Sequence, residues 1–287
     1  MNHDNYLVRP GHKFRLKDYD PASTGKFADK GEAAARLQDD IVKLAELQAM
    51  LYAQNTNALL IVLQGMDTAG KDGTIRHVMS GVNPQGTQVH SFRAPSAEEL
   101  DHDYLWRSMR ALPERGDISI FNRSYYEEVL VVRVHPELLE RQKLPPYTGR
   151  KSIWKRRFEE INAFEKYLTD NGIIVLKFFL NLSKGEQKRR LLDRLNTPDK
   201  NWKVSAADSA ERLHWDEYIA AFEDAIKHTS SAHAPWHIVP ADNKWFAHAV
   251  VADAILGALK KLKVAYPVVS EARRLELVKV KQALEAD

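Results

Sequence analysis

A glycine-bounded loop that ends in lysine is the segment best suited to chemistry. The run Gly65-Met66-Asp67-Thr68-Ala69-Gly70-Lys71-Asp72-Gly73 follows a short apolar run and precedes a helical pattern. The two glycines permit a tight turn in which successive backbone N–H groups point at phosphate oxygens. Lys71, which we expect to be exposed, adds a mobile charge for the terminal phosphates. The spacing matches G-x-x-x-x-G-K, and the predicted phosphate-binding residues are Met66, Thr68, Ala69, Gly70, Asp72 and Gly73.

Two carboxylates make this loop unusual. Asp72 occupies the position where Ser or Thr commonly ligates Mg²⁺, and Asp67 lies inside the loop. A carboxylate beside bound phosphates is repelled unless a divalent cation lies between them. We therefore predict that Asp67 helps to hold Mg²⁺, or Mn²⁺ in its place, because these cations prefer oxygen ligands. The alternative is that Asp67 caps backbone amides of the loop.

A second polar segment follows the apolar run 118–121. It reads Asn122-Arg123-Ser124-Tyr125-Tyr126-Glu127-Glu128. In open parallel sheets ligands gather at the carboxyl ends of strands, where this segment falls. Arg123 can clamp a phosphate with two N–H groups. Glu127 or Glu128 can supply the acidic group that Asn122 lacks, although a turn cap and ordinary surface acids remain open for Asn122 and Glu128.

A cationic helix and loop come later in the chain. Gln187, Arg190 and Arg194 share one helix face by their spacing, whereas Arg189 lies about 100° from Arg190 around the axis. Lys200 and Lys203 belong to the segment 199–208, which we expect to be an exposed loop after the helix ends at Pro198. Residues 184–208 are typical of a lid that covers phosphates and excludes water. A solvated helix face is the alternative.

The pattern of apolar runs predicts an α/β fold around a parallel sheet. Five short runs that suit buried parallel strands lie at 58–63, 87–92, 118–121, 173–180 and 236–239. Helical patterns separate them, at 32–54, 152–168 and 183–195 and after 208, and Ser96 to Glu99 forms a capping box. We expect an irregular arm over residues 1–30 and a charged helical tail over 263–287.

The composition limits the classes of function. The 287 residues suit one large domain and contain no cysteine, so disulfides and Cys-ligated metals are excluded. Neither a secretory leader nor an apolar run of roughly 20 residues is visible, so we expect a cytoplasmic protein without a membrane partner. The net charge is +3, but 150–157 and 184–203 are locally basic, which indicates a polyanion. These segments lack regularly interleaved aromatics, so we expect no nucleic-acid partner.

With these residues in view, the chain closely resembles the family-2 polyphosphate kinases from about Leu37 to Leu262. The resemblance rests on several segments in order: Gly65 to Gly73, Asn83-Pro84 with Gly86, Tyr104 to Arg107, Phe121 to Tyr126, Lys177 to Leu180, Glu186-Gln187 with Arg190 and Arg194, Lys200 with Trp202-Lys203, and Pro240 to Lys244. It implies a thymidylate-kinase-like P-loop core with a helical lid. It also implies Mg²⁺-dependent phosphoryl transfer between inorganic polyphosphate and a nucleoside mono- or diphosphate.

The resemblance implies roles for individual residues. Asp67 and Lys71 fall on the family's catalytic loop, Arg123 on its second-motif arginine, and Arg190 and Arg194 on its lid arginines. The run from Phe121 to His135 resembles the subgroups that accept AMP, including those that accept both AMP and ADP. The candidates for nucleotide binding are Arg93, Asn122, Glu127 and Arg133.

The predicted activity is reversible transfer of a phosphoryl group from inorganic polyphosphate to AMP, ADP or both. The second ionisation of a nucleotide phosphate lies near 6, so in-line transfer requires no general base. We expect the basic segments to guide the polymer and the chain to form a homo-oligomer, a dimer or tetramer. The alternatives are an ATP-dependent nucleotide kinase and a protein that binds polyphosphate or nucleotide, including ATP, without turnover.

Overall fold

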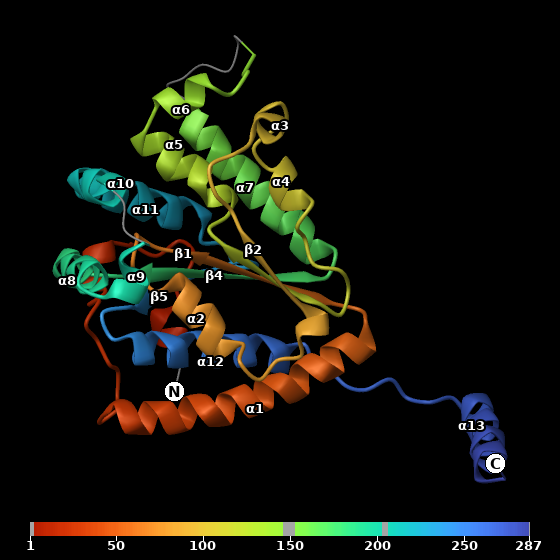
Figure 1. Ribbon diagram of the computed structural model, residues 1–287. Helices are drawn as coiled ribbons and strands as arrows, with labels where there is room; N and C mark the ends of the chain where they lie inside the picture. Colours follow the sequence, from red (N-terminus) through yellow and green to blue (C-terminus); the bar gives the residue numbers. More distant parts are fainter. Residues whose placement is uncertain (1–2, 146–152, 203–205, 287) are drawn as a thin grey trace.

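A five-stranded parallel sheet forms the centre of the protein (Figure 1). The computed structural model describes residues 3–145, 153–202 and 206–286. The strand order is β2-β3-β1-β4-β5, and every neighbouring pair is parallel. The strands are β1 Ala58–Gln64, β2 Thr87–Ser91, β3 Ile118–Asn122, β4 Ile173–Asn181 and β5 Trp236–Pro240. All five predicted runs and the α/β fold class are confirmed.

Strand β1 lies in the middle, where all of its residues are buried, because all of them except Gln64 are apolar. Its side chains alternate between two cores. Leu60 and Val62 face the core shared with α7 (Ile153–Asp170) and α11 (Trp215–Thr229). Leu59 and Ile61 face the core shared with α1 (Lys30–Gln54) and α12 (Lys244–Lys261). This two-sided burial places the end of β1, and the loop after it, at the centre of the carboxyl edge of the sheet.

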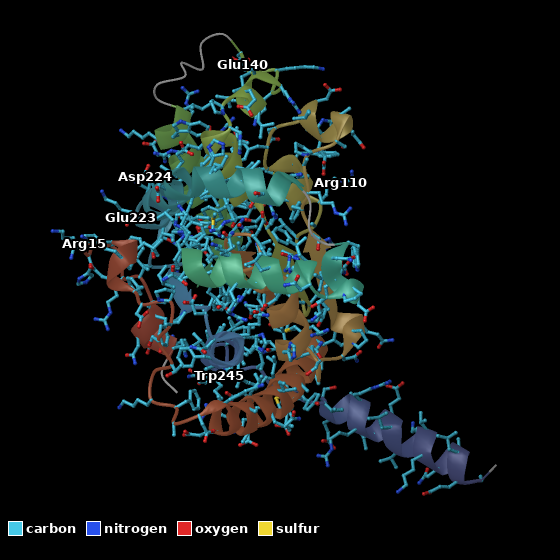
Figure 2. All side chains as sticks on the ribbon, turned by 60° about the vertical axis from the view of Figure 1, so that its left-hand side comes forward. Arg15, Arg110, Glu140, Glu223, Asp224 and Trp245 are labelled. Carbon is cyan, nitrogen blue, oxygen red and sulfur yellow. The ribbon has the colours of Figure 1, made fainter. Side chains whose placement is uncertain are left out.

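Strand β5 is covered along its outer edge by the N-terminal arm. The arm contains two 3₁₀ turns, His3–Tyr6 and Leu16–Asp18, and Leu7 forms a bridge with His237. Leu16 is buried, and its N–H donates to Glu223 of α11 at 2.8 Å. Figure 2 shows Arg15 on the same side of the molecule as Glu223. The expected irregular arm is therefore a packed cover of one sheet edge.

Short helices connect the remaining strands. The helix α2 (Lys71–Val78) follows the loop after β1, and a 3₁₀ turn, Pro84–Gly86, precedes β2. The predicted capping box is confirmed, since Ser96 and Glu99 exchange hydrogen bonds at the start of α3 (Ala97–Leu100). The other short elements are α4 Trp106–Met109, the 3₁₀ turn Tyr125–Val129, α5 Val131–Val134 and α6 Glu137–Glu140.

The prediction of an exposed loop over residues 199–208 is wrong in part, because short helices occupy much of this segment. After α8 (Lys184–Leu195), Pro198 starts a new helix, α9 (Pro198–Asn201), because proline fits the first turn of a helix. A further helix, α10 (Ala206–Glu211), and a 3₁₀ turn, Arg212–His214, lead into α11. The predicted site residue Lys203 lies outside the described residues.

The predicted C-terminal helix is present as α13 (Glu271–Glu285). All of its residues are exposed, and it extends away from the rest of the chain (Figures 1 and 2). No helix among the residues that the structure describes is both long and apolar enough to span a membrane.

Candidate active site

The loop between β1 and α2 has the backbone geometry of a phosphate cradle. Gly65 and Gly70 have φ of 154° and 108°, which favour glycine, and a side chain on Gly65 would come within 3.0 Å of the Leu180 carbonyl. Thr68 also has a positive φ, 66°. The first backbone N–H groups of α2 have no acceptor within the helix and point toward the loop. The loop therefore presents a row of N–H donors to an anion.

Lys71 is buried, so the expectation of an exposed cation is wrong. Only 9% of its surface is exposed, and it is the first residue of α2 rather than a residue of the open loop. Its Nζ donates to the carbonyl oxygens of Gly65 at 2.6 Å and Met66 at 3.3 Å. Burial, and then the nearby Arg123, lowers the pKa of Lys71 to about 8. The negative charge of a bound phosphate would raise the pKa of Lys71 again and so oppose both effects.

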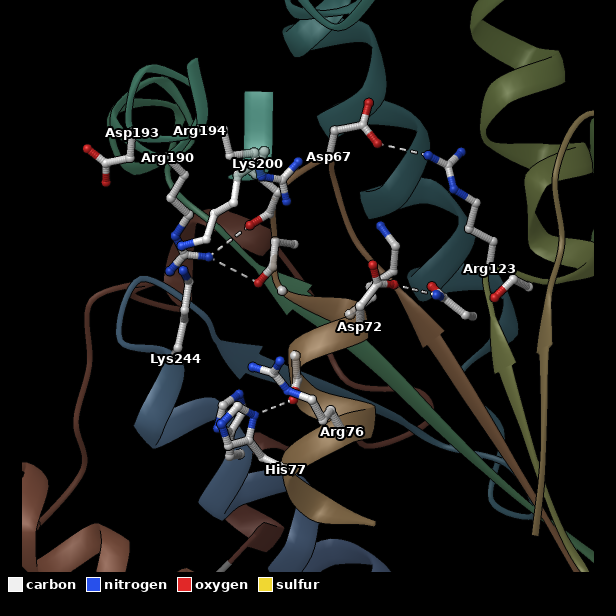
Figure 3. Close-up of a pocket in the computed structure, with 18 of the residues that line it drawn as sticks. Asp67, Asp72, Arg76, His77, Arg123, Arg190, Asp193, Arg194, Lys200 and Lys244 are labelled. Atoms are coloured by element: carbon white, nitrogen blue, oxygen red, sulfur yellow. Dashed lines mark hydrogen bonds and ion pairs between the residues drawn. The ribbon is translucent and has the colours of Figure 1, made fainter. Parts of the chain in front are cut away.

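Four side chains form what we call the loop cluster: Asp67, Asp72, Asn122 and Arg123. Figure 3 labels Asp67, Asp72 and Arg123. Arg123 donates to Asp67 at 2.8 Å and to Glu127 at 3.1 Å. Asn122 donates to Asp72 at 2.7 Å. Arg123 adopts a φ of 64°, an uncommon conformation for a side chain other than glycine, at the end of β3. The cluster joins the carboxyl ends of β1 and β3, as the sequence predicted, and Asp67 makes an ion pair instead of an amide cap.

Arg190 lies at the loop, but carbonyl groups occupy its donors. Its Nη1 donates to the carbonyls of Thr68 and Ala69, and its Nη2 to those of Ala241 and Asp242, at 2.6–3.1 Å. Its Nε donates to Glu186 at 2.8 Å. Arg190 therefore fastens α8 to the loop and to the end of β5. In this arrangement Arg190 positions the loop, and its N–H groups are already bonded to protein oxygens instead of being available to a phosphate.

A cleft of about 740 Å³ opens over the loop. Its walls come from the loop, α2, the ends of β2 and β3, α8, the α9 region and α12. The predicted site residues that line it are Asp67, Thr68, Ala69, Gly70, Lys71, Asp72, Gly73, Arg93, Asn122, Arg123, Arg190, Arg194 and Lys200. Met66 and Glu127 line a further cavity of about 210 Å³ behind the loop, and Glu127 also lines the cavity described next.

Several cations of the cleft carry no acidic partner. In the described part of the chain, no carboxylate makes an ion pair with Arg76, Arg93, Arg194, Lys200 or Lys244, all of which line the cleft. Arginines elsewhere are commonly paired, as Arg133 with Asp224 and Arg36 with Asp40 are. The unpaired cations leave the cleft with an attraction for polyanions.

A smaller cavity of about 270 Å³ adjoins the cleft and shares Phe92, Arg93 and Arg123 with it. Its walls include Leu100, Tyr104 and Val131, and the Arg107 guanidinium lies 5.4 Å from the centre of the Phe92 ring. An apolar cavity with cations at its mouth suits a ligand that has a ring and a phosphate group.

Some predicted residues lie away from the cleft. Arg133 points from α5 to Asp224 of α11, at 2.5 Å, and lines none of the three cavities described above. Asp224 lies near Glu223 at the edge of the molecule (Figure 2). The expectation that Arg133 binds nucleotide therefore has no geometric support.

Glu128 and the basic segment 150–157 also have structural partners. Glu128 is buried and accepts from Arg157 at 2.9 Å and from Gln142 at 2.7 Å. Burial raises its pKa against the opposing effect of Arg157. Lys155 is exposed beside Glu159, and residues 150–152 lie outside the described residues. The expectation that Arg157 guides a polymer is wrong, since it balances a buried acid.

Sequence reasoning missed one group of cleft residues, which we call the distal cluster: Arg76, His77, Lys244 and His248. The first two come from α2 and the last two from α12. His77 and His248 stack with ring centres 4.5 Å apart. Lys244 belongs to a segment that carried the family resemblance, but no local signal pairs positions about 170 residues apart in the sequence.

The loop offers ligands that suit Mg²⁺. Mg²⁺ is commonly held by one or two carboxylates together with substrate phosphates. Asp67 is half-buried at the loop, and its bond to Arg123 uses one carboxylate oxygen. The buried hydroxyl of Thr68 has no hydrogen-bond partner among the described residues. No group of three or more His, Asp or Glu in the described ranges could hold a metal by itself, so a cation here would depend on the phosphates.

Known proteins resemble this chain over nearly its whole length. The sequence model of the polyphosphate kinase 2 family matches residues 27–267. The chain belongs to this family. It is 51% identical over 280 residues, 97% of each chain, to the ADP-polyphosphate phosphotransferase of Rhodopseudomonas palustris. It is 43% identical to the AMP/ADP-polyphosphate phosphotransferase of Meiothermus ruber, over 91% of this chain and 94% of that one.

A solved structure of the family has the same fold. The crystal structure of polyphosphate kinase 2 from Arthrobacter aurescens TC1 covers 96% of each chain with a TM-score of 0.87 and 40% sequence identity. Family membership thus agrees with the observed sheet, the loop and the cationic cleft.

Proposed function

We propose that this polyphosphate kinase 2 transfers a phosphoryl group reversibly between inorganic polyphosphate and AMP or ADP. The observation that carries the proposal is the cleft in which Arg76, Arg194, Lys200 and Lys244 surround the phosphate loop without acidic partners. Two relatives that are similar over nearly the whole chain are named for transfer between polyphosphate and ADP or AMP. The polymer would lie along these cations, and the nucleotide would occupy the adjoining apolar cavity.

The acceptor site follows from the neighbouring cavity. Phe92 and Tyr104 offer ring surfaces for a base, and Arg93 and Arg123 stand where this cavity meets the cleft. A nucleotide placed this way would direct its terminal phosphate toward Lys71. The AMP or ADP oxygen would form a new bond to the terminal phosphorus while the bond to the next bridging oxygen breaks. The shortened chain keeps that oxygen.

Catalysis in this site would depend on positioning and on charge neutralisation. The attacking phosphate oxygen is already ionised at neutral pH, since its pKa lies near 6, so no side chain needs to take its proton. Backbone N–H groups of the loop and the Lys71 ammonium would hold the transferred group in line. Asp67 would help to hold Mg²⁺, whose positive charge would help to neutralise the phosphates. Arg190 would keep the loop in shape by holding its carbonyls.

A single assay tests the proposal. Purified protein receives AMP or ADP, Mg²⁺ and polyphosphate without ATP, and products are followed by chromatography. We expect ADP from AMP, or ATP from ADP, in step with the loss of chain phosphate, and no product with Lys71→Met. Product formed only from ATP and AMP would instead identify an ATP-dependent nucleotide kinase. Binding of polyphosphate without any product would identify a protein that binds without turnover.

A further inference from the structure

A buried ion pair lies under the segment that follows β3, and it takes no part in the transfer described above. The side chains of Lys177 of β4 and Glu165 of α7 have no exposed surface, and their charged atoms are 2.6 Å apart. Burial lowers the pKa of Lys177, and the charge of Glu165 opposes this effect. Replacing such a pair with apolar residues is often neutral or stabilising, so stability alone is a weak reason to keep it.

Both charged groups are bonded to tyrosines of the segment after β3. Lys177 Nζ donates to the Tyr126 hydroxyl at 2.9 Å and to the Thr229 carbonyl at 2.8 Å. Tyr125 and Tyr126 donate to the same oxygen of Glu165, at 2.9 and 2.8 Å. Burial, and then the charge of Glu165, raises the pKa of both tyrosines, so both hydroxyls stay protonated. We call Tyr125, Tyr126, Glu165 and Lys177 the buried network.

The buried network fixes one side of the turn at Arg123. A φ of 64° persists at a residue other than glycine only where its surroundings enforce it. Before the turn, the Arg123 N–H donates to the Leu63 carbonyl of β1 at 3.1 Å. After the turn, the Ser124 hydroxyl accepts from the Tyr126 N–H and from the Gln64 side chain, each at 3.1 Å. The position of Tyr126 therefore helps to set the backbone at Arg123.

This turn determines where the Arg123 guanidinium lies. The guanidinium donates to Asp67 and Glu127, and Figure 3 shows it pointing toward Asp67. Arg123 lines both the cleft and the apolar cavity that adjoins it. The guanidinium stands at the end of a long side chain, so a small backbone rotation displaces it. A displacement of about 1 Å in a positioning group can lower turnover about a hundredfold.

We propose that Tyr126, held by Glu165 and Lys177, positions Arg123 toward the phosphate of the acceptor nucleotide. The proposal rests on the proposed function. Tyr126, Glu165 and Lys177 are all among the described residues, and none of them lines the cleft or either of the two further cavities. They are therefore positioning residues that act through Arg123, and binding of polyphosphate to the other cations of the cleft does not depend on them.

The first test is Tyr126→Phe, which removes the hydroxyl and keeps the ring that packs 4.7 Å from the Trp236 ring. We expect kcat to fall about tenfold and KM for the nucleotide to rise about threefold to tenfold, while KM for long polyphosphate is unchanged. A purely structural role would move neither KM, because unfolding only reduces the amount of active enzyme. Ile255→Val weakens the core on the other face of the sheet and is the matched control, with wild-type values of kcat and of both KM.

A double-mutant cycle tests whether the effect passes through Arg123. In an Arg123→Ala background, we expect Tyr126→Phe to change kcat by less than about twofold. Independent, multiplying losses in the two variants would overturn the proposal, as would a Tyr126→Phe enzyme with both KM values unchanged. Either result leaves the proposed function standing as long as the wild type transfers phosphoryl groups. If the wild type transfers none, the proposed function itself fails.

Discussion

The loop cluster and the distal cluster share one cleft but differ in how their charges are balanced. In the loop cluster each side chain has a partner within the cluster, with Asp67 on Arg123 and Asp72 on Asn122. In the distal cluster the described residues supply no acid to Arg76 or Lys244. Phosphate is therefore attracted at one end and meets two carboxylates at the other. The difference indicates that affinity for the polymer and control of the transfer reside in separate places.

The largest effect should come from Lys71, which lies beside the loop cluster. Lys71→Met keeps the apolar stem in its buried position and removes the charge. We expect turnover to fall by about a thousandfold or more, since loss of one preorganised donor to a transferring group costs this order of rate. Binding of long polyphosphate should fall far less because the distal cluster is intact. Turnover and binding are measured on the same preparation, and circular dichroism checks the fold.

The outcome that would contradict this comparison is easily recognised. A correctly folded Lys71→Met with turnover near that of the wild type would remove the loop from the reaction. Equal loss of binding and turnover would mean that one charge serves the whole cleft, and the two clusters would then not be separable.

The second effect concerns the carboxylate of the loop cluster. Asp67→Asn keeps the size of the side chain and removes the charge that opposes phosphate. We expect turnover to fall about a hundredfold, with a weaker dependence on Mg²⁺. Polyphosphate binding in the presence of a chelator should be retained or become tighter, because a local repulsion has been removed. Turnover across a Mg²⁺ titration and binding in chelator are the two measurements.

An Asp67→Asn enzyme with normal activity and an unchanged response to Mg²⁺ would place the cation elsewhere. Asp72→Asn is a useful comparison, since Asp72 is more exposed and is bonded to Asn122. We expect this variant to change the Mg²⁺ response less than Asp67→Asn does.

The sequence was sufficient for the sheet and the loop because both have local signals. A parallel strand buried on both faces needs a continuous apolar run such as Leu59 to Leu63, and a phosphate loop needs glycines at fixed spacing. The burial of Lys71 could not be predicted, because it depends on how α2 packs onto the carbonyls of Gly65 and Met66. The partner of Arg133, Asp224, is likewise set by the packing of α5 on α11.

The distal cluster shows the same limit at longer range. His77 and His248 meet only because α2 and α12 lie together on one face of the sheet. Each histidine alone resembles an ordinary helix residue. The prediction of a loop over 199–208 was wrong for a different reason. Short helices such as α9 are stabilised by tertiary contacts and caps more than by a repeating apolar pattern, so the sequence carries little signal for them.

The third effect separates two adjacent arginines of α8. Arg190 is buried and satisfies four carbonyls, so Arg190→Ala would leave buried acceptors without donors. We expect it to lower the free energy of unfolding by about 2–4 kcal/mol and turnover by tenfold or more, because the loop loses its support. Arg189 is exposed and pairs with Glu186 and Asp193, so Arg189→Ala should leave both quantities near those of the wild type.

Urea unfolding and turnover at saturating polyphosphate test this pair. Arg190→Lys should recover part of the stability, since an ammonium can still donate to some of the carbonyls. If Arg190→Ala lowers turnover while the free energy of unfolding is unchanged, Arg190 contacts the reacting phosphates directly instead of fastening α8 to the loop.

The smallest effect is the pH dependence of Lys71. Its pKa is lowered to about 8, so the free enzyme loses the lysine charge as the pH rises through 8. Because phosphate binding needs that charge, kcat/KM for polyphosphate should fall about tenfold for each pH unit above this value. Bound phosphates favour the charged form, so the alkaline limb of kcat should lie at a higher pH than the limb of kcat/KM. The acceptor phosphate ionises near 6 and cannot produce this limb.

Lys71→Arg identifies the group that titrates. Arginine stays charged over the whole accessible range, so the residual activity of this variant should show no limb near pH 8. If the limb persists unchanged in Lys71→Arg, the titrating group lies elsewhere. If the limb is absent from the wild type, Asp67, Glu127 and Asp72 stabilise the Lys71 ammonium more strongly than burial and Arg123 destabilise it. In that case the loop cluster, with its carboxylates, would already hold the charge that the transferred phosphate must meet, and the electrostatic contrast with the distal cluster would be larger than the structure indicates.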